Sequence, residues 1–186
     1  MRLPRWNHAP RACASRRAWL TCCTCLLAIG ATTFGVDRAA GAHDGQQVDY
    51  ALHQPTTGSV ICKPGEEAEK AVNGLWASKT QDKFCSKQRP AWLQIDLSSE
   101  REVHGFRIRH AGAGGEPVTM NTRAFHISTS DDGNTWTTVV SVQNNHDSVS
   151  THPIKPIRAQ YVRLVVTQPT QAEDDPATRI YEVEVW

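Results

Sequence analysis

Polar side chains gather in the segment 110–123, which reads His-Ala-Gly-Ala-Gly-Gly-Glu-Pro-Val-Thr-Met-Asn-Thr-Arg. Four of them have hydrogen-bonding groups suited to a sugar: His110, Glu116, Asn121 and Arg123. Charged groups and planar amides pair well with neighbouring hydroxyls. Trp76, in the preceding loop, offers an aromatic face on which the C–H face of a pyranose could stack. This set predicts a carbohydrate site built from two loops.

Several of these residues also have a purely structural role open to them. Trp76 could pack in the core instead of facing a ligand. His110 could be a hydrogen-bonded residue at a strand end, and Arg123 could form an ion pair with Glu116 that shapes the loop.

The chain carries no enzyme signature. Its histidines do not form a His-Glu-x-x-His motif, and neither Gly-x-Ser-x-Gly nor a cysteine–histidine nucleophile arrangement is present. A glycosidase needs two opposed carboxylates in a cleft, whereas Asp131-Asp132-Gly133 is typical of a hairpin turn. We therefore predict that the protein is not an enzyme.

The first 42 residues have the layout of an export signal. Five arginines precede an apolar run over 19–36, and Ala-Gly-Ala at 40–42 matches the cleavage site of a secretory signal peptide. We predict removal of 1–42, which leaves 43–186 as the secreted domain. Ser-Arg-Arg at 15–17 also resembles a twin-arginine signal, so both export routes are open. The alternative is that the apolar run is retained as a membrane anchor.

The predicted mature part has about 144 residues, enough for one domain with its own core and too few for two. The leader holds six Arg and one Asp, so the mature part carries a net charge of −4. This acidic balance argues against binding to nucleic acid or to anionic lipid, both of which attract basic surfaces.

Two of the six cysteines, Cys62 and Cys85, lie outside the leader. An exported chain meets an oxidising environment, so we predict a disulfide between them, with two independent buried thiols as the alternative. Metal binding by two cysteines alone is disfavoured because closed zinc sites use four ligands.

Short alternating segments follow one another without a long helical pattern between them. They lie at 91–97, 103–110, 125–130, 135–142, 160–167 and 179–186, and are rich in β-branched and aromatic residues. Six or more short strands without helices predict a sandwich or a barrel. Asp96, at the end of one such segment, is expected to pin a loop by accepting backbone N–H bonds.

In order and spacing these segments resemble the discoidin family, also called the coagulation factor 5/8 type C family. The resemblance covers about 48–186. Its motifs include Trp-Leu-Gln-Ile-Asp-Leu at 92–97, Ser-Asp-Asp-Gly-Asn-Thr-Trp at 130–136 and Arg-Ile-Tyr-Glu-Val-Glu-Val at 179–185. It implies an all-β, galactose-binding-like jelly-roll β-sandwich of about eight antiparallel strands, with Trp92, Trp136 and Tyr161 in its core. The bacterial carbohydrate-binding modules of this fold are the relatives it suggests.

The resemblance also implies a structural calcium ion where the first long loop, 63–90, meets the last strand. By position its ligands are the carbonyls of Lys70 and Tyr181 and the side chains of Asn73, Asp82 and Glu182. Calcium takes six to eight hard oxygen ligands, and carbonyls with carboxylates supply them. Asn73 stands where the family usually has Asp, and the alternative is that Asn73-Gly74 is only a tight turn.

We therefore predict a secreted, non-catalytic carbohydrate-binding module for galactose-like or related terminal sugars on glycans or cell-wall polymers. A single site predicts weak affinity unless the protein assembles. A separately encoded glycosidase or surface protein could be its partner. The alternative is an adhesion module that binds a protein or lipid through an exposed Leu75-Trp76 tip, although the acidic charge disfavours anionic membranes.

Overall fold

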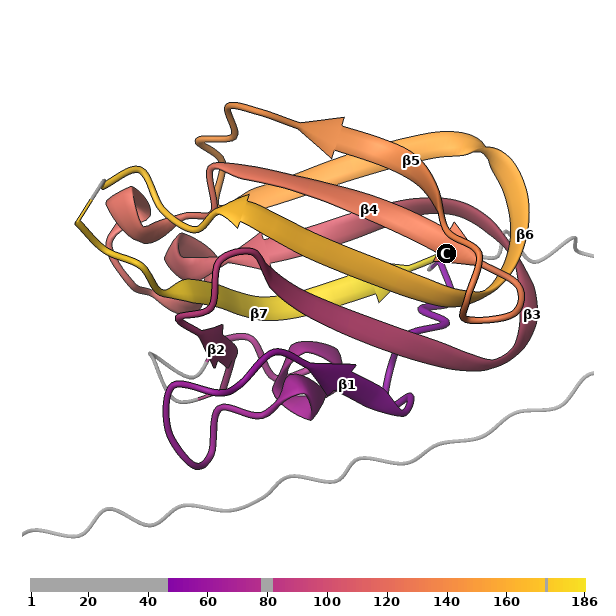
Figure 1. The fold of residues 1–186 in the computed structure, drawn as a ribbon, viewed down its shortest axis with the longest axis horizontal. Coiled ribbons are helices and arrows are strands. Elements are labelled where there is room, and N and C mark those ends of the chain that lie inside the picture. The colour runs from indigo at the N-terminus through magenta and orange to yellow at the C-terminus, as the bar shows by residue number, and fades with distance from the viewer. Residues whose placement is uncertain (1–46, 78–81, 173) are drawn as a thin grey trace, which may run out of the picture. The chain divides into compact units, whose positions relative to one another are not determined.

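The computed structural model describes residues 47–77, 82–172 and 174–186, so the predicted leader lies outside the described residues. This part of the chain forms seven strands and three short 3-10 helices (Figure 1). The strands are β1 (Thr56–Gly58), β2 (Phe84–Ser86), β3 (Ala91–His110), β4 (Ala124–Ser130), β5 (Thr137–Val142), β6 (Val149–Gln168) and β7 (Thr178–Val185). The helices are η1 (Ala68–Val72), η2 (Ala111–Gly114) and η3 (Val118–Met120).

Two long, bent strands organise the sheet. All pairs are antiparallel and follow the order β2-β7-β3-β6-β4-β5, with β1 added to β3. The first half of β3 pairs with the second half of β6, and the second half of β3 pairs with the first half of β6. Register shifts between Asp96 and Arg101, and between Val103 and Gly105, interrupt the β3–β6 ladder where the halves meet.

The halves of β3 and β6 belong to two layers. The larger layer holds β1, β4 and β5, and the smaller layer holds β2 and β7 (Figure 1). The predicted all-β jelly-roll sandwich is thereby confirmed. The segments predicted at 91–97 and 103–110 are parts of one strand, because the bend keeps β3 continuous from one layer to the other.

The two-residue period of the strands fills the space between the layers. Leu93 and Ile95 in β3, and Phe125 and Ile127 in β4, are almost completely buried. Burial of each such side chain contributes about 1.5–3 kcal/mol. The same period turns every second residue of these strands outward, toward solvent or toward the loops.

Three aromatic residues predicted for the core lie on the outer face instead. Trp92 and Tyr161 are one position out of phase with the buried residues of β3 and β6, so both are only half-buried. Trp136 is also half-buried, and its ring centre is 3.8 Å from the guanidinium carbon of Arg163. The prediction that these rings fill the core is wrong: alternation turns Trp92 and Tyr161 outward, and Trp136 lies just before β5, where its ring rests on Arg163.

The predicted disulfide between Cys62 and Cys85 and the predicted role of Asp96 in holding a loop are both confirmed. Cys62 and Cys85 are bonded, with Cα atoms 5.4 Å apart, so the long loop is tied to β2. Asp96 accepts the backbone N–H of Ser98 at 2.8 Å, as expected of a residue that pins a loop. Among the described residues, no helix is long and apolar enough to cross a membrane.

Candidate functional site

Three of the residues predicted to hold calcium meet at the end of η1. The side-chain amide of Asn73 donates to Asp82 Oδ1 at 2.9 Å, and the ammonium of Lys70 lies 3.1 Å from the same oxygen. Asn73 Oδ1 accepts the N–H of Leu75 at 2.9 Å, which is the geometry of an Asx turn. The tight turn is therefore present, and two of the predicted ligand side chains, Asn73 and Asp82, meet beside it.

Glu182 connects the last strand to this loop. Its carboxylate oxygens accept the N–H of Gly74 at 3.1 and 3.2 Å, and Gly74 has φ of 74°, a conformation that suits glycine. Glu182 is only 1% exposed. This burial raises its pKa to about 8, and the charges of Asp49 and Glu184 act in the same direction. The neighbouring Tyr181 is fully buried in β7.

The donors gathered here fit calcium in their chemistry. Within the described part of the chain, no lysine or arginine forms an ion pair with the buried carboxylate of Glu182. At a pKa of about 8 this carboxyl group is largely protonated near pH 7, and a bound cation would favour its ionised form. Asp82, Glu182 and Asn73 Oδ1 supply hard oxygens from side chains, and the carbonyls of Lys70 and Tyr181 would add two more. A metal ion would compete with the ammonium of Lys70 for Asp82.

Trp76 lies beside this loop, on the outer face of the smaller layer. Its ring centre is 4.1 Å from the guanidinium carbon of Arg109, an outward residue of β3. Trp76 is 37% exposed and Leu75 is 61% exposed. An open hollow of about 420 Å³ is lined by Gly74, Leu75, Trp76, Ala77 and Asp82. The alternative that Trp76 packs in the core is therefore wrong.

His110 is fully buried at the end of β3, which corrects the prediction that it contacts a sugar. Its Nε2 is 3.0 Å from the hydroxyl of Ser150, and its ring centre lies 5.6 Å from that of Phe125. Burial, with a smaller effect from His152, lowers the pKa of His110 to about 3. The ring is neutral near pH 7, and its role is the structural one at a strand end.

Asn121 is also fully buried, so the prediction of a sugar contact is wrong for this residue too. Its Oδ1 accepts the N–H of Gly112 at 2.7 Å. Its Nδ2 donates to the carbonyl of His146 at 3.1 Å and to the hydroxyl of Ser148 at 3.2 Å. Asn121 therefore holds η2 against the segment that precedes β6.

Glu116 is held in a network of charges. Its carboxylate lies 3.3 Å from the ammonium of Lys83 and 3.1 Å from Arg179, and it accepts the hydroxyl of Tyr181 at 2.7 Å. The side chain is 8% exposed. These partners give Glu116 a structural role, and its contact with a sugar stays a prediction. They also differ from the alternative of an ion pair with Arg123, because Lys83 and Arg179 are the cations beside Glu116.

Arg123 is half-buried just before β4, where its backbone N–H donates to the carbonyl of Gln168 at 3.0 Å. Gln168 lines a second hollow, of about 280 Å³, together with Arg89, Thr167, Pro169, Thr170 and Ala172. The sequence analysis missed this hollow because its walls come from two distant segments without a motif. Among the described residues, no hydrogen bond or ion pair joins the five predicted sugar residues to one another.

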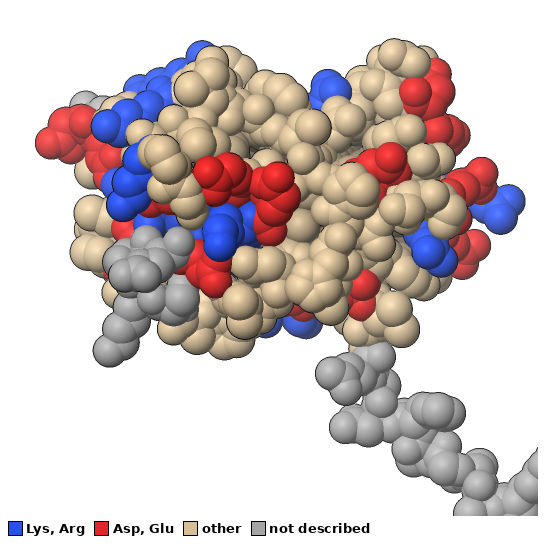
Figure 2. Space-filling view, turned by 90° about the horizontal axis from the view of Figure 1, so that it is seen from below, with Lys and Arg blue, Asp and Glu red and all other residues tan. Residues whose placement is uncertain are grey.

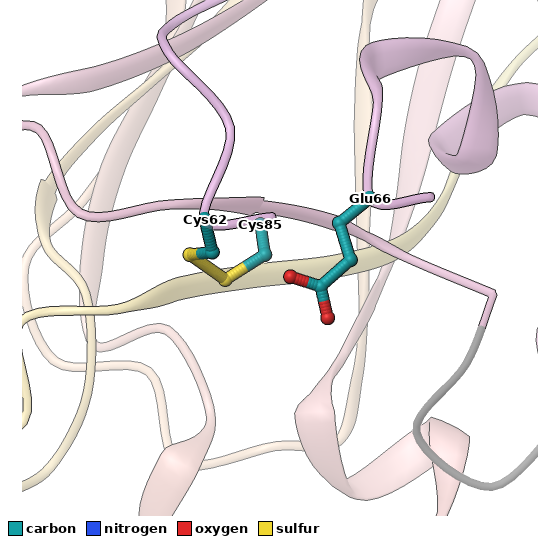
Figure 3. A group of neighbouring side chains, drawn as sticks. All are labelled: Cys62, Glu66 and Cys85. Atoms are coloured by element: carbon teal, nitrogen blue, oxygen red, sulfur yellow. A yellow bond between two sulfur atoms is a disulfide. The ribbon is translucent and has the colours of Figure 1, made fainter. Parts of the chain in front are cut away.

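Cys62, Cys85 and Glu66 form a cluster whose donor atoms all lie within 4.8 Å of one another (Figure 3). The arrangement resembles a metal site, but the two sulfurs are bonded to each other and offer no thiolate. The carboxylate of Glu66 is 3.2 Å from the ammonium of Lys83. The cluster is therefore a disulfide beside a buried ion pair.

A two-layer antiparallel sandwich with its candidate ligand residues on long loops defines the galactose-binding-like class of jelly rolls. The model of the F5/8 type C domain family matches residues 54–183, and the chain belongs to this family. No curated protein sequence matches the chain significantly.

Solved structures of carbohydrate-binding modules share the fold. The family 32 carbohydrate-binding module of EndoD from Streptococcus pneumoniae is 31% identical, with a TM-score of 0.63, over 73% of this chain and 97% of that module. A chitosan-binding module of a chitosanase/glucanase from Paenibacillus sp. IK-5 is 22% identical, with a TM-score of 0.61, over 75% and 99%. A fucose-binding module from S. pneumoniae is 19% identical, with a TM-score of 0.63, over 75% and 94%. The last two comparisons bear on the fold alone.

The buried His110 predicts loss of stability in acid. Its pKa is lowered in the folded state, so the unfolded chain binds the extra proton, and stability falls as the pH drops from about 6.5 toward 3. We expect His110→Gln to reduce this slope by up to about 1.4 kcal/mol per pH unit. Chemical unfolding at several pH values between 7 and 4 measures it. The exposed His146→Gln serves as the control, and an equal slope in wild type and His110→Gln would contradict the assignment.

The charge network predicts a structural effect of Glu116. Glu116→Ala leaves Lys83 and Arg179 without this carboxylate in a poorly solvated site, so we expect unfolding free energy to fall by about 3 kcal/mol. The matched control is Glu100→Ala, which breaks an exposed pair with Arg158 and is expected to change stability by less than about 1 kcal/mol. Denaturant titration compares the two, and equal effects would show that the Glu116 network adds nothing.

Proposed function

We propose that this protein is a secreted, non-catalytic carbohydrate-binding module that recognises galactose-like or related terminal sugars. Its family and its 31% identity to a module described as carbohydrate-binding support a glycan ligand. The predicted leader and the Cys62–Cys85 disulfide support export.

The proposal depends mainly on the exposure of the Trp76 ring at the edge of an open hollow. An indole that is 37% exposed borders an open hollow and lies beside the hydrogen-bonding groups of Asp82. A pyranose can stack its C–H face on such a ring while its hydroxyls reach polar groups at the edge. Because His110 and Asn121 are fully buried and Glu116 is held by Lys83 and Arg179, the proposed contact centres on Trp76 rather than on the second loop.

The state of the turn carboxylates supports a non-catalytic role. Asp132 accepts the backbone N–H groups of Thr135 and Asn134 and the hydroxyl of Ser130. These bonds lower its pKa to about 2, whereas a general acid must hold its proton near neutral pH. Asp132 therefore serves the turn before β5.

The surface charge also fits a neutral ligand. Lysine and arginine side chains alternate with acidic ones on the face shown in Figure 2, with no continuous basic field. A mixed surface of this kind gives no electrostatic footprint for nucleic acid or anionic membrane.

An adhesion module for a protein partner is the second candidate. It is favoured by Leu75, which is 61% exposed next to Trp76, and by the exposed Val118 on η3. Exposed apolar residues on loop tips are suited to contact with another protein.

A glycan-array screen of the purified protein tests the two candidates. We expect binding to glycans with terminal galactose or a related sugar, and Trp76→Ala to weaken it about tenfold or more through loss of the stacking surface. Trp136→Ala is the control, because Trp136 stacks on Arg163 on a different face. A blank array from folded protein would contradict the sugar proposal and favour the protein partner.

We also propose that calcium binds at Lys70, Asn73, Asp82, Tyr181 and Glu182 and has a structural role. The support is the contact of Asn73 with Asp82 and the buried side chain of Glu182, which ties β7 to the same loop through Gly74. When bound, the ion would favour the ionised form of Glu182 and would hold the loop onto β7.

Thermal unfolding with calcium and with chelator tests this site. Calcium at one hundred times its dissociation constant stabilises a protein by about 2.7 kcal/mol, so we expect a higher melting temperature with calcium. Glu182→Gln should abolish the difference, whereas Glu184→Gln, two residues further along β7, should keep it. An identical melting temperature in calcium and chelator would contradict the calcium site.

A further inference from the structure

The cation beneath Trp76 is fixed from below by ion pairs. Arg109 donates from Nε to Glu184 Oε1 at 2.9 Å, and its Nη2 is 2.8 Å from the same oxygen. The other carboxylate oxygen of Glu184 accepts from Arg107 at 2.7 Å. All three side chains project from the outer face of the β3–β7 ladder, where Arg107 lies opposite Glu184. The guanidinium of Arg109 is therefore held in place by rigid strands.

Among the described residues, two hydrogen bonds hold the backbone of the segment that carries the indole. The turn is held by the bond from Leu75 N–H to Asn73 and by the bond from Gly74 N–H to Glu182. Leu75 and Ala77, on either side of Trp76, are both exposed. An exposed tryptophan on such a loop would sample several rotamers without a surface to lie on. Arg109, 4.1 Å from the ring centre, provides that surface.

We propose that Arg109, oriented by Glu184, is a positioning residue that holds the Trp76 indole in one orientation for its ligand. The guanidinium covers one face of the ring and leaves the opposite face as the surface for stacking. A planar cation on an aromatic ring contributes attraction that an ammonium in the same place does not reproduce. Holding the ring before the ligand arrives reduces the entropy lost on binding. The inference rests on the proposed role of Trp76 in ligand binding.

The chain offers a matched internal control. Arg163 lies 3.8 Å from the ring centre of Trp136, so the same kind of stack exists on the larger layer. Arg109→Met and Arg163→Met each remove one guanidinium and keep much of its aliphatic stem. Glu184→Gln keeps the shape of the carboxylate but removes the charge that orients Arg109, and it serves where Arg109→Met fails to fold.

The experiment records the indole N–H signals of purified protein labelled with ¹⁵N, with the Trp76 signal assigned through Trp76→Phe. We expect Arg109→Met and Glu184→Gln to lower the heteronuclear NOE of the Trp76 indole, which reports mobility on the picosecond-to-nanosecond scale. Arg163→Met should leave the Trp76 signal unchanged. An unchanged NOE in Arg109→Met, or an equal fall in Arg163→Met, would overturn the proposal.

Titration with galactose, followed on the same signals, separates this inference from the proposed function. We expect Arg109→Met to weaken galactose binding about five- to tenfold, and Arg163→Met by less than about twofold. If wild-type protein binds no galactose while Arg109→Met still loosens the indole, the positioning role stands and the galactose-like ligand is contradicted. If binding is normal in Arg109→Met although the indole is mobile, the positioning role in binding is overturned.

Discussion

The pairing of β3 with β6 through both layers is the constraint on which the rest of the structure depends. Because β3 bends from the larger layer into the smaller one through two register shifts, its inward face changes from odd-numbered residues such as Leu93 and Ile95 to even-numbered ones such as Phe106 and Ile108. The register with β7 then places Arg109 opposite Glu182 and Arg107 opposite Glu184. A shift of one residue would exchange these charged side chains with Ile108 and its buried neighbours. The candidate calcium ligand Glu182 and the cation beneath Trp76 are thus positioned by one ladder.

The fold and the disulfide could be predicted because they depend on patterns that a sequence shows directly. That Asn73 and Asp82 lie together is predicted only by the resemblance to the family, and a hydrogen bond joins them. Period-two alternation predicts strands, and the order of the motifs predicts their arrangement. The direction in which a loop residue faces is different, since it depends on what the loop packs against. In η2, a Cβ on Gly114 would lie 2.0 Å from the ring of Tyr181, so this glycine allows the loop to lie directly on β7. His110 is buried because it continues the inward phase of β3, and Glu116 is held by Lys83, Arg179 and Tyr181, although both side chains are of the type that contacts sugars.

Several charged side chains on the two long loops form ion pairs with one another or with the last strand. Lys83 comes from the first long loop and Glu116 from the second, and their ion pair joins the two. The ion pair of Arg179 with Glu116 joins the last strand to this network, and the ion pair of Glu66 with Lys83 joins the segment next to the disulfide. Breaking one member leaves a charge in a poorly solvated place, so the network favours a single arrangement of the loops. Residues held in these ion pairs are poor candidates for ligand contact, so the proposed ligand surface is limited to the region around Trp76.

Two arginine–tryptophan stacks show how one interaction serves two purposes. Trp136 donates its indole N–H to the carbonyl of Gly133 at 3.2 Å, and it follows a turn that Asp132 holds with several hydrogen bonds. Its orientation is set by these local contacts, and the stack on Arg163 adds to a ring that is already fixed. Trp76 stacks in the same way on a different arginine, Arg109, and it is the more exposed of the two tryptophans. Because few local hydrogen bonds among the described residues hold Trp76, the stack on Arg109 sets the direction in which its ring faces. Arg109 projects from paired strands, so the ring keeps one orientation, which suits a surface that binds a ligand.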